Sequence, residues 1–199
     1  LYREADSLLL DDLRDPVQSA SILQLVGGGC HRVSEVAGRL GKPASSLARP
    51  MQRLLELDLL RRDRPFGAPV REARKTLYRV ADPFLRYWFR YVAPNRSRLE
   101  ARLVGQVADA VRRDEARHVA EIWEDLARAS VPRLDLFGRV WGQASAWWGP
   151  GVDCKPLEVD LVAESADGSA ILVGSVKWEV ETDLARTAAE LAQAAGRLP

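Results

Sequence analysis

The clearest pattern of apolar and polar positions lies in residues 33–56, and it predicts two short helices joined by a turn. Ser34 is suited to cap a helix that ends at Leu40, residues 41–44 form the turn, and Ser45 or Ser46 caps a second helix. Pro50 lies near the first turn of this second helix, where a missing N–H costs least. One face of the second helix is apolar, with Leu47, Met51, Leu54 and Leu55, and another carries Ser46, Arg49, Arg53 and Glu56.

Two extended segments follow these helices. Residues 59–62 favour a strand, residues 65–69 carry two prolines and a glycine that interrupt it, and residues 76–80 favour a second strand. Two helices followed by a strand, a loop and a strand are typical of a winged helix-turn-helix.

Helical patterns lie on both sides of this module. Residues 2–14 and 17–26 each predict a short amphipathic helix. A further helix opens at Asp82-Pro83 and ends at Pro94, and helical patterns then continue to about Ala129, with an interruption near Asp114. One face of this helix is aromatic, with Phe84, Tyr87, Trp88 and Tyr91, and we expect this face to pack in a core rather than to stack on bases.

The texture of the chain changes after Pro132. Residues 138–149 are rich in glycine and tryptophan and favour turns. Residues 157–163 and 170–178 then predict two strands of a hairpin, joined by a turn at Asp167-Gly168, and residues 182–195 predict a helix. Helices and strands in this order indicate an α+β protein.

Charge separates the two halves. Residues 1–113 hold 21 basic and 13 acidic residues, and the remainder holds 8 and 15, so a net charge of +1 hides halves of +8 and −7. The segment 61–75 alone has six basic and two acidic residues. This asymmetry predicts a polyanionic partner for the first half, and either a cation site or a solvated acidic surface for the second.

Double-stranded DNA is the partner that fits the basic face. Ser46, Arg49 and Arg53 on the second helix can enter a major groove and contact bases. The basic residues of the wing would lie along the phosphates; they are Arg61, Arg62, Arg64, Arg71, Arg74 and Lys75. A solvated face or a protein-docking surface is the alternative.

A second candidate site lies on the predicted hairpin. Glu158 and Asp160 are two residues apart and share a face of the first strand, while Ser175 and Lys177 share a face of the second. Carboxylates suit a hard cation such as Mg2+ or Mn2+, and an adjacent lysine can orient or activate water for phosphodiester hydrolysis. The alternative is an ordinary ion pair across an exposed hairpin.

Other metal sites and membrane spans are not indicated. Cys30 and Cys154 are 124 positions apart and lack the paired spacing of a structural zinc site. No apolar run is long enough to cross a bilayer and no signal peptide opens the chain, so a cytoplasmic location is expected. Because the only methionine is Met51, we expect part of the protein to lie upstream of Leu1.

Six segments together resemble the C-terminal half of the archaeal-type ATPase family found in archaea and bacteria. The most specific is RKTLYRVADPFLRYWFRYVAPNRSRLE; the others are SSLARPMQRLLELDLL, VAEIWEDLARASVPRL, WGQASAWW, VDLVAES and LVGSVKW. In that family a P-loop ATPase domain precedes a winged helix, and the end of the chain resembles the PD-(D/E)xK nuclease fold. The resemblance covers nearly the whole chain and implies that the P-loop domain lies upstream.

The resemblance also implies roles for single residues. Asp160 matches the strand aspartate of the family, Lys177 its lysine, and Glu124 the helix glutamate that precedes the strands. The usual Gly-Glu-x-Lys-Trp, however, reads Gly174-Ser175-Val176-Lys177-Trp178 here. Asp160 and Glu124 remain as metal ligands, and any Mg2+ or Mn2+ would bind weakly.

The sequence thus predicts an α+β chain in which a winged helix-turn-helix precedes an incomplete restriction-endonuclease-like α/β domain. The expected parts are a helical lead-in (1–16), the winged helix (17–81), a helical connector (82–113) and the nuclease-like domain (114–199), which stops before its last strand. DNA binding with an inactive nuclease-like domain is the favoured function. A regulatory module that docks on a protein, and an active metal-dependent nuclease, are the alternatives. The oligomeric state is left open.

Overall fold

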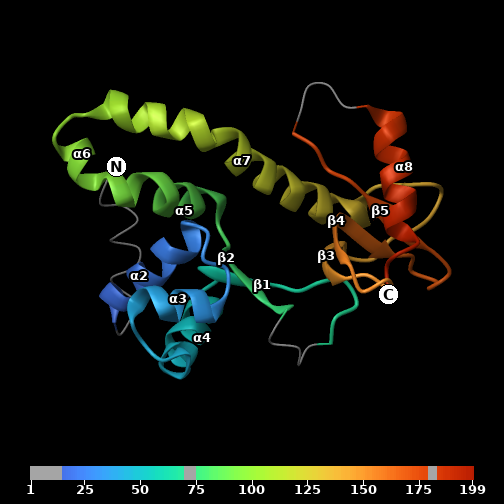
Figure 1. Ribbon diagram of the computed structural model, residues 1–199, viewed down its shortest axis with the longest axis horizontal. Helices are drawn as coiled ribbons and strands as arrows, with labels where there is room; N and C mark the ends of the chain where they lie inside the picture. The colour runs from blue at the N-terminus through green and yellow to red at the C-terminus, as the bar shows by residue number, and fades with distance from the viewer. Residues whose placement is uncertain (1–14, 70–74, 179–182) are drawn as a thin grey trace. The chain divides into compact units, whose positions relative to one another are not determined.

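The computed structural model describes residues 15–69, 75–178 and 183–199. The chain, which Figure 1 colours by residue number, forms two compact units. Unit 1 comprises residues 1–63 and 76–115, and unit 2 comprises residues 64–75 and 116–199. The segment 64–75, which was expected to be the loop of the wing, thus belongs to unit 2.

The helix expected over residues 2–14 lies outside the described residues. From residue 15 on, unit 1 has three helices and a short 3-10 turn before its first strand. α2 spans Pro16–Gly27, α3 Val33–Leu40, the 3-10 helix η1 Ala44–Leu47, and α4 Ala48–Glu56. Two expected caps are wrong. Arg32 rather than Ser34 precedes α3, and its backbone N–H donates to Glu35 at 3.0 Å. Ser46 donates to the carbonyl of Pro43 at 2.7 Å instead of capping α4, because η1 already brings the chain into helical geometry.

A two-stranded antiparallel hairpin follows. β1 (Leu60–Asp63) pairs with β2 (Leu77–Val80), with Leu60 opposite Val80 and Arg61 opposite Arg79. Tyr78 donates its N–H to the carbonyl of His31 at 2.8 Å, which ties β2 to the loop before α3. Three helices followed by this hairpin have the element order of a winged helix.

One hydrophobic core holds unit 1 together. Its fully buried members come from α2, α3, η1, α4, both strands and the π-helical turn η3 (Trp88–Val92), and include Ile22, Leu23, Leu47, Leu54, Leu60 and Phe89. Each buried side chain of this size stabilises the fold by about 1.5–3 kcal/mol. The apolar stripe predicted for α4 faces this core.

The connector departs from the expected pattern. α5 (Pro83–Tyr87) continues through a π-helical turn η3 (Trp88–Val92), a 3-10 turn η4 (Ala93–Asn95) and α6 (Arg96–Glu100). α7 then runs unbroken over Val104–Ser130, so the interruption expected near Asp114 is wrong. Asp114 instead accepts hydrogen bonds from Arg90 Nε at 2.7 Å and the Tyr91 hydroxyl at 2.8 Å, which join the helices. Trp88 and Tyr91 are buried as expected, but Phe84 and Tyr87 are exposed.

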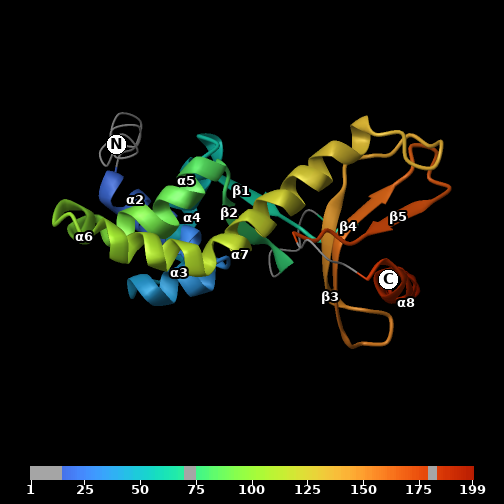
Figure 2. The same cartoon turned by 90° about the horizontal axis from the view of Figure 1, so that it is seen from above.

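Unit 2 contains a three-stranded antiparallel sheet in the order β3-β4-β5, which Figure 2 shows beside α8. β3 spans Ser145–Pro150, β4 Pro156–Glu164, β5 Ile171–Gly174 and α8 Leu184–Ala195, while a 3-10 turn η5 (Val131–Arg133) follows α7. The predicted hairpin is confirmed, although β5 ends at Gly174. β3 was missed because tryptophan and glycine dominate its sequence. The helices and two sheets confirm the α+β class.

Segment 64–69 contacts the β3 edge of the sheet. Phe66 donates its N–H to the carbonyl of Ala146 at 2.8 Å, and its ring packs on the cluster of Trp147, Leu157, Val159 and Val162. Trp148 Nε1 donates to the carbonyl of Lys75 at 3.1 Å. Covering an edge strand in this way blocks pairing with other chains.

None of the helices in the described ranges is long and apolar enough to cross a membrane.

Two helical glycines predict opposite effects of the same substitution. A Cβ at Gly27 would lie 2.8 Å from Phe89 Cβ, whereas a Cβ at Gly38 would meet no atom within 4 Å. Gly38→Ala should therefore stabilise the protein by about 0.5–1 kcal/mol through helix propensity. Gly27→Ala should destabilise it by about 1–3 kcal/mol, because the buried helices must move apart. Urea unfolding of both variants checks this, and a stabilising Gly27→Ala would contradict the packing described.

The β4–β5 turn predicts a pH effect. Asp167 accepts hydrogen bonds from the Ser165 hydroxyl at 2.6 Å and from the Ser169 N–H at 3.1 Å, and these lower its pKa from 3.8 to about 2. The resulting stabilisation is complete above pH 3.8 and is lost as the pH falls through about 2. In an NMR titration Ser165→Ala should raise the pKa of Asp167 toward 3.8, whereas Ser175→Ala should leave it unchanged. Titration of Asp167 near 3.8 in the parent protein would refute the turn geometry.

Candidate nucleic-acid interface and carboxylate cluster

α4 carries the residues expected to read bases. Leu47, which directly precedes the helix, and Met51 and Leu54 within it are buried, while Arg49 and Arg53 are exposed. Because residues 49 and 53 are four positions apart, both lie on one outer face. Arg53 lies 3.5 Å from Glu56, with about half of each side chain exposed. An exposed pair of this kind contributes little to stability, so Arg53 can exchange Glu56 for a phosphate or a base.

A groove of about 610 Å³ runs beside α4. Its lining comes from α3, η1, α4 and the two strands of the hairpin, and includes Arg49, Gln52, Arg53, Arg62 and Tyr78. Arg62 donates to Gln52 Oε1 at 2.8 Å, and its guanidinium lies 6.0 Å from the centre of the Tyr78 ring. Three arginines therefore line one concave surface of unit 1.

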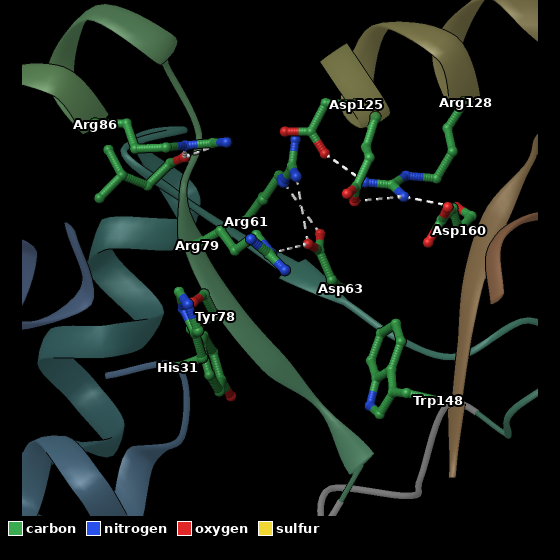
Figure 3. A network of polar contacts seen from close by, with 12 residues as sticks. His31, Arg61, Asp63, Tyr78, Arg79, Arg86, Asp125, Arg128, Trp148 and Asp160 are labelled. Atoms are coloured by element: carbon green, nitrogen blue, oxygen red, sulfur yellow. Dashed lines mark hydrogen bonds and ion pairs between the residues drawn. The ribbon is translucent and has the colours of Figure 1, made fainter. Parts of the chain in front are cut away.

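Asp63 pairs with two arginines of the β1–β2 hairpin. Arg61 and Arg79 are directly opposite each other in the strand register. Two like charges in this arrangement destabilise a hairpin. The Asp63 carboxylate lies 3.0 Å from the Nε of each arginine, as Figure 3 shows. Arg79 was missed in the sequence because the strand pairing that brings it to Asp63 cannot be read from local spacing. Arg61 is thus bound in an internal ion-pair network.

The remaining basic residues expected in the wing are differently placed. Arg64 is half-buried and Lys75 lies with its ammonium 5.9 Å from the centre of the Trp147 ring, both within unit 2. The backbone of their segment is hydrogen-bonded to β3. Arg71 and Arg74 lie outside the described residues.

A β-bulge positions Asp160 in unit 2. Ser145 pairs with Val162 and Trp147 with Val159, so two residues of β4, Asp160 and Leu161, oppose one residue of β3. Bulges of this kind redirect side chains and are common beside functional sites. The sequence pattern of alternating residues gave no sign of this extra residue.

Three neighbouring groups contact one oxygen of the Asp160 carboxylate. Its Oδ2 accepts hydrogen bonds from the Ser175 hydroxyl at 3.0 Å and from the Val176 N–H at 2.9 Å. Lys177 Nζ lies 3.8 Å from the same oxygen. The structure therefore brings Asp160, Ser175 and Lys177 together, with the serine hydroxyl bound to the carboxylate.

Arg128 is a member of this cluster that the sequence did not reveal. It extends from α7 and donates through Nη1 to the backbone carbonyl of Asp160 at 2.7 Å, as Figure 3 shows. The same guanidinium lies 3.5 Å from Glu124 and 2.9 Å from Asp125. The spacing of Glu124, Asp125 and Arg128 along a helix would have suggested the ion pairs, but not the contact with β4.

Glu158 stands apart from these contacts. It is exposed on β4 opposite Trp148, and the groups described around the Asp160 carboxylate do not include it. Within the described ranges, no group of three or more His, Cys, Asp or Glu side chains is arranged to hold a metal ion. In this Asp160 cluster, the carboxylates of Glu124, Asp125 and Asp160 pair with two cationic side chains, Arg128 and Lys177.

Comparisons with known proteins give a family and two similar chains. A Methanocaldococcus jannaschii protein described as uncharacterized is 25% identical over 182 residues, which is 90% of this chain and 40% of that protein. This chain thus spans less than half of that relative. A mutant of Lactococcus lactis ZitR matches with a TM-score of 0.31 and 14% identity over 57% of this chain and 73% of that chain.

The model of the DUF234 family, described as archaeal and bacterial proteins of unknown function, matches residues 88–189. This range contains η3, α6 and α7, the bulge at Asp160 and the residues that bind its carboxylate. The chain belongs to the DUF234 family of archaeal and bacterial proteins.

Proposed function

We propose that this chain binds double-stranded DNA through α4, and that unit 2 is a nuclease-like domain that does not cleave. The observation that carries the proposal is the two-sided character of α4. Its apolar residues are held in the core, while Arg49 and Arg53 point outward beside a groove that also contains Arg62. A helix with this character can enter the major groove, where arginine recognises guanine through two hydrogen bonds.

Charge supports a polyanionic partner. Unit 1, which carries α4, holds 17 basic and 14 acidic residues, a net charge of +3. Arg62 and Arg53 are exposed; Arg62 donates to the neutral amide oxygen of Gln52, and Arg53 lies beside the solvent-exposed carboxylate of Glu56. Neither contact requires much energy to exchange for a phosphate. Arg61 contributes less, because Asp63 already compensates its charge.

We further infer that the chain is the C-terminal part of a prokaryotic ATPase whose P-loop domain lies outside this sequence. The segments that resemble the archaeal-type ATPase family support this inference. The Methanocaldococcus jannaschii relative is also compatible with it, since this chain spans 40% of its length.

The contacts of Asp160 support an inactive nuclease-like site. A catalytic cation needs several oxygen ligands with free lone pairs. Here Ser175 replaces a carboxylate with a hydroxyl that donates to Asp160, and Arg128 holds the nearby Glu124. Lys177 and Asp160 form an ion pair, and Lys177 is half-exposed. The cluster stabilises the junction of α7, β4 and the segment after β5.

A regulatory module that docks on a protein is the second candidate. Trp123 and Trp178 are 44% and 52% exposed, and their ring centroids are 5.8 Å apart. Leu126, one turn along α7, is also exposed. Exposed aromatic pairs are common anchors of protein interfaces. This candidate predicts a protein partner and no affinity for DNA.

Arginine substitutions in unit 1 test the DNA proposal. Arg49→Ala with Arg53→Ala should weaken binding to a preferred duplex about 10–100-fold, because base contacts are lost. Arg62→Ala should instead weaken binding to every duplex and reduce the slope of log K against log salt by about one. Fluorescence anisotropy at several salt concentrations measures both effects.

Arg186→Ala provides the matched control, since Arg186 is an exposed arginine of α8 that pairs with Glu190 at 2.8 Å. It should leave binding unchanged. Parental affinity in both unit 1 variants would show that α4 is not the DNA surface, and an absence of binding to any duplex would favour the protein-docking candidate.

Restoring a carboxylate tests the inactive site. Ser175→Glu should raise the affinity for Mn2+ at least tenfold in calorimetry, because it replaces a donor with a second anionic ligand. Adding Arg128→Gln should raise it further, since a positive charge near the site is removed. Ser97→Glu, which adds a carboxylate on α6, should have no effect. Metal-dependent DNA cleavage by the parent chain, abolished by Asp160→Ala and by Lys177→Ala, would refute the proposal.

A further inference from the structure

A cavity of about 380 Å³ lies in unit 1 between α5–η3, α6 and the first turns of α7. It is separate from the groove at α4 and from the Asp160 cluster. Aromatic and aliphatic side chains form most of its lining, among them Phe84, Tyr87, Trp88, Tyr91, Val104 and Val111. Its size and apolar character are those of small-molecule pockets, which measure about 300–1,000 Å³.

The rim of this cavity exposes large apolar side chains. Phe84 and Val104 are each 54% exposed, and Tyr87 is 37% exposed. The four aromatic residues that the sequence assigned to a core are therefore divided, with two inside and two at the opening. Apolar side chains gathered around a hollow commonly mark a binding site. The π-helical turn η3, which supplies Trp88 and Tyr91, is a geometry often found at such sites.

The lining of the cavity favours an anionic ligand. Its lining includes Arg112 and no carboxylate.

Arg112 adds a positive charge at the rim. Its Nη1 lies 2.6 Å from Asp109, and both side chains are more than 60% exposed. This solvent-exposed pair is weak, and the guanidinium keeps further N–H donors for an anion. The hydroxyl of Tyr91 is already bound to Asp114, so it does not compete.

We propose that this cavity binds a small molecule with an aromatic or aliphatic body and one anionic group. The body lies against the aromatic and valine side chains, and the anionic group pairs with Arg112. The site goes beyond DNA binding and does not depend on it, because α4 contributes no residue to the cavity.

Two dyes that differ in one group test the proposal on the full chain. The anionic probe is 1-anilinonaphthalene-8-sulfonate, and the neutral probe is N-phenyl-1-naphthylamine, which has the same ring body without the sulfonate. We expect the anionic probe to bind with one-to-one stoichiometry and about tenfold more tightly than the neutral one, the gain expected of a charge-assisted pair. Dye fluorescence and calorimetry measure affinity and stoichiometry.

Variants locate the bound dye. Val111→Phe should fill the cavity and reduce the affinity for both dyes at least tenfold, and Ala108→Leu serves the same purpose if the first variant unfolds in circular dichroism. Arg112→Gln should remove the preference for the anionic dye while leaving the neutral dye unchanged. Arg113→Gln, the adjacent exposed arginine that does not line the cavity, should change neither affinity.

Three results would overturn the proposal. These are binding of several dye molecules per chain, equal affinity for the two dyes, and full affinity in both cavity-filling variants. Any of them would indicate a general apolar surface rather than a built anion site. A loss of DNA binding in the α4 variants would leave this test unaffected, so the two proposals can fail separately.

Discussion

Burial of one apolar stripe along η1 and α4 fixes the orientation on which the rest of unit 1 depends. Leu47 and Leu54 are fully buried and Met51 is 3% exposed, so the helix cannot rotate without bringing these side chains into water. Their burial stabilises that orientation by several kcal/mol, about 1.5–3 for each side chain. The outer face, with Arg49 and Arg53, is therefore held in a defined position by packing rather than by its own contacts.

The fold also fixes the orientation of Asp160, but there it turns the side chain toward neighbouring donors rather than toward solvent. There a β-bulge directs the carboxylate toward groups that donate to it, namely the Ser175 hydroxyl and the Val176 N–H. Arg128 joins the backbone of this residue to the carboxylates of α7. Polar groups paired in this way stabilise a fold, and these contacts all fall on Oδ2, one of the two oxygens with which Asp160 could hold a cation. The geometry thus supports a structural role for residues that would serve catalysis in another context.

The sequence predicted those features that depend on local periodicity. The two helices around Gly41 and the hairpin of β4 and β5 follow from spacing and turn residues, and the structure has both. Contacts between distant segments were not predictable from such patterns. Arg128 meets Asp160 across 32 positions, Phe66 meets Ala146 across 80, and Asp63 compensates Arg79 only because β1 pairs with β2. The cavity at Trp88 arises likewise from the packing of helices that the sequence had treated as one aromatic face.

Amide hydrogen exchange with and without duplex DNA tests the central claim most directly, because it reports on each element of the chain separately. Saturating DNA should slow exchange in η1 and α4, over residues 44–56, and leave β4 and β5 unchanged. Unchanged exchange in α4 at saturating DNA, or slowing confined to residues 156–174, would contradict the account and place any nucleic-acid contact on unit 2.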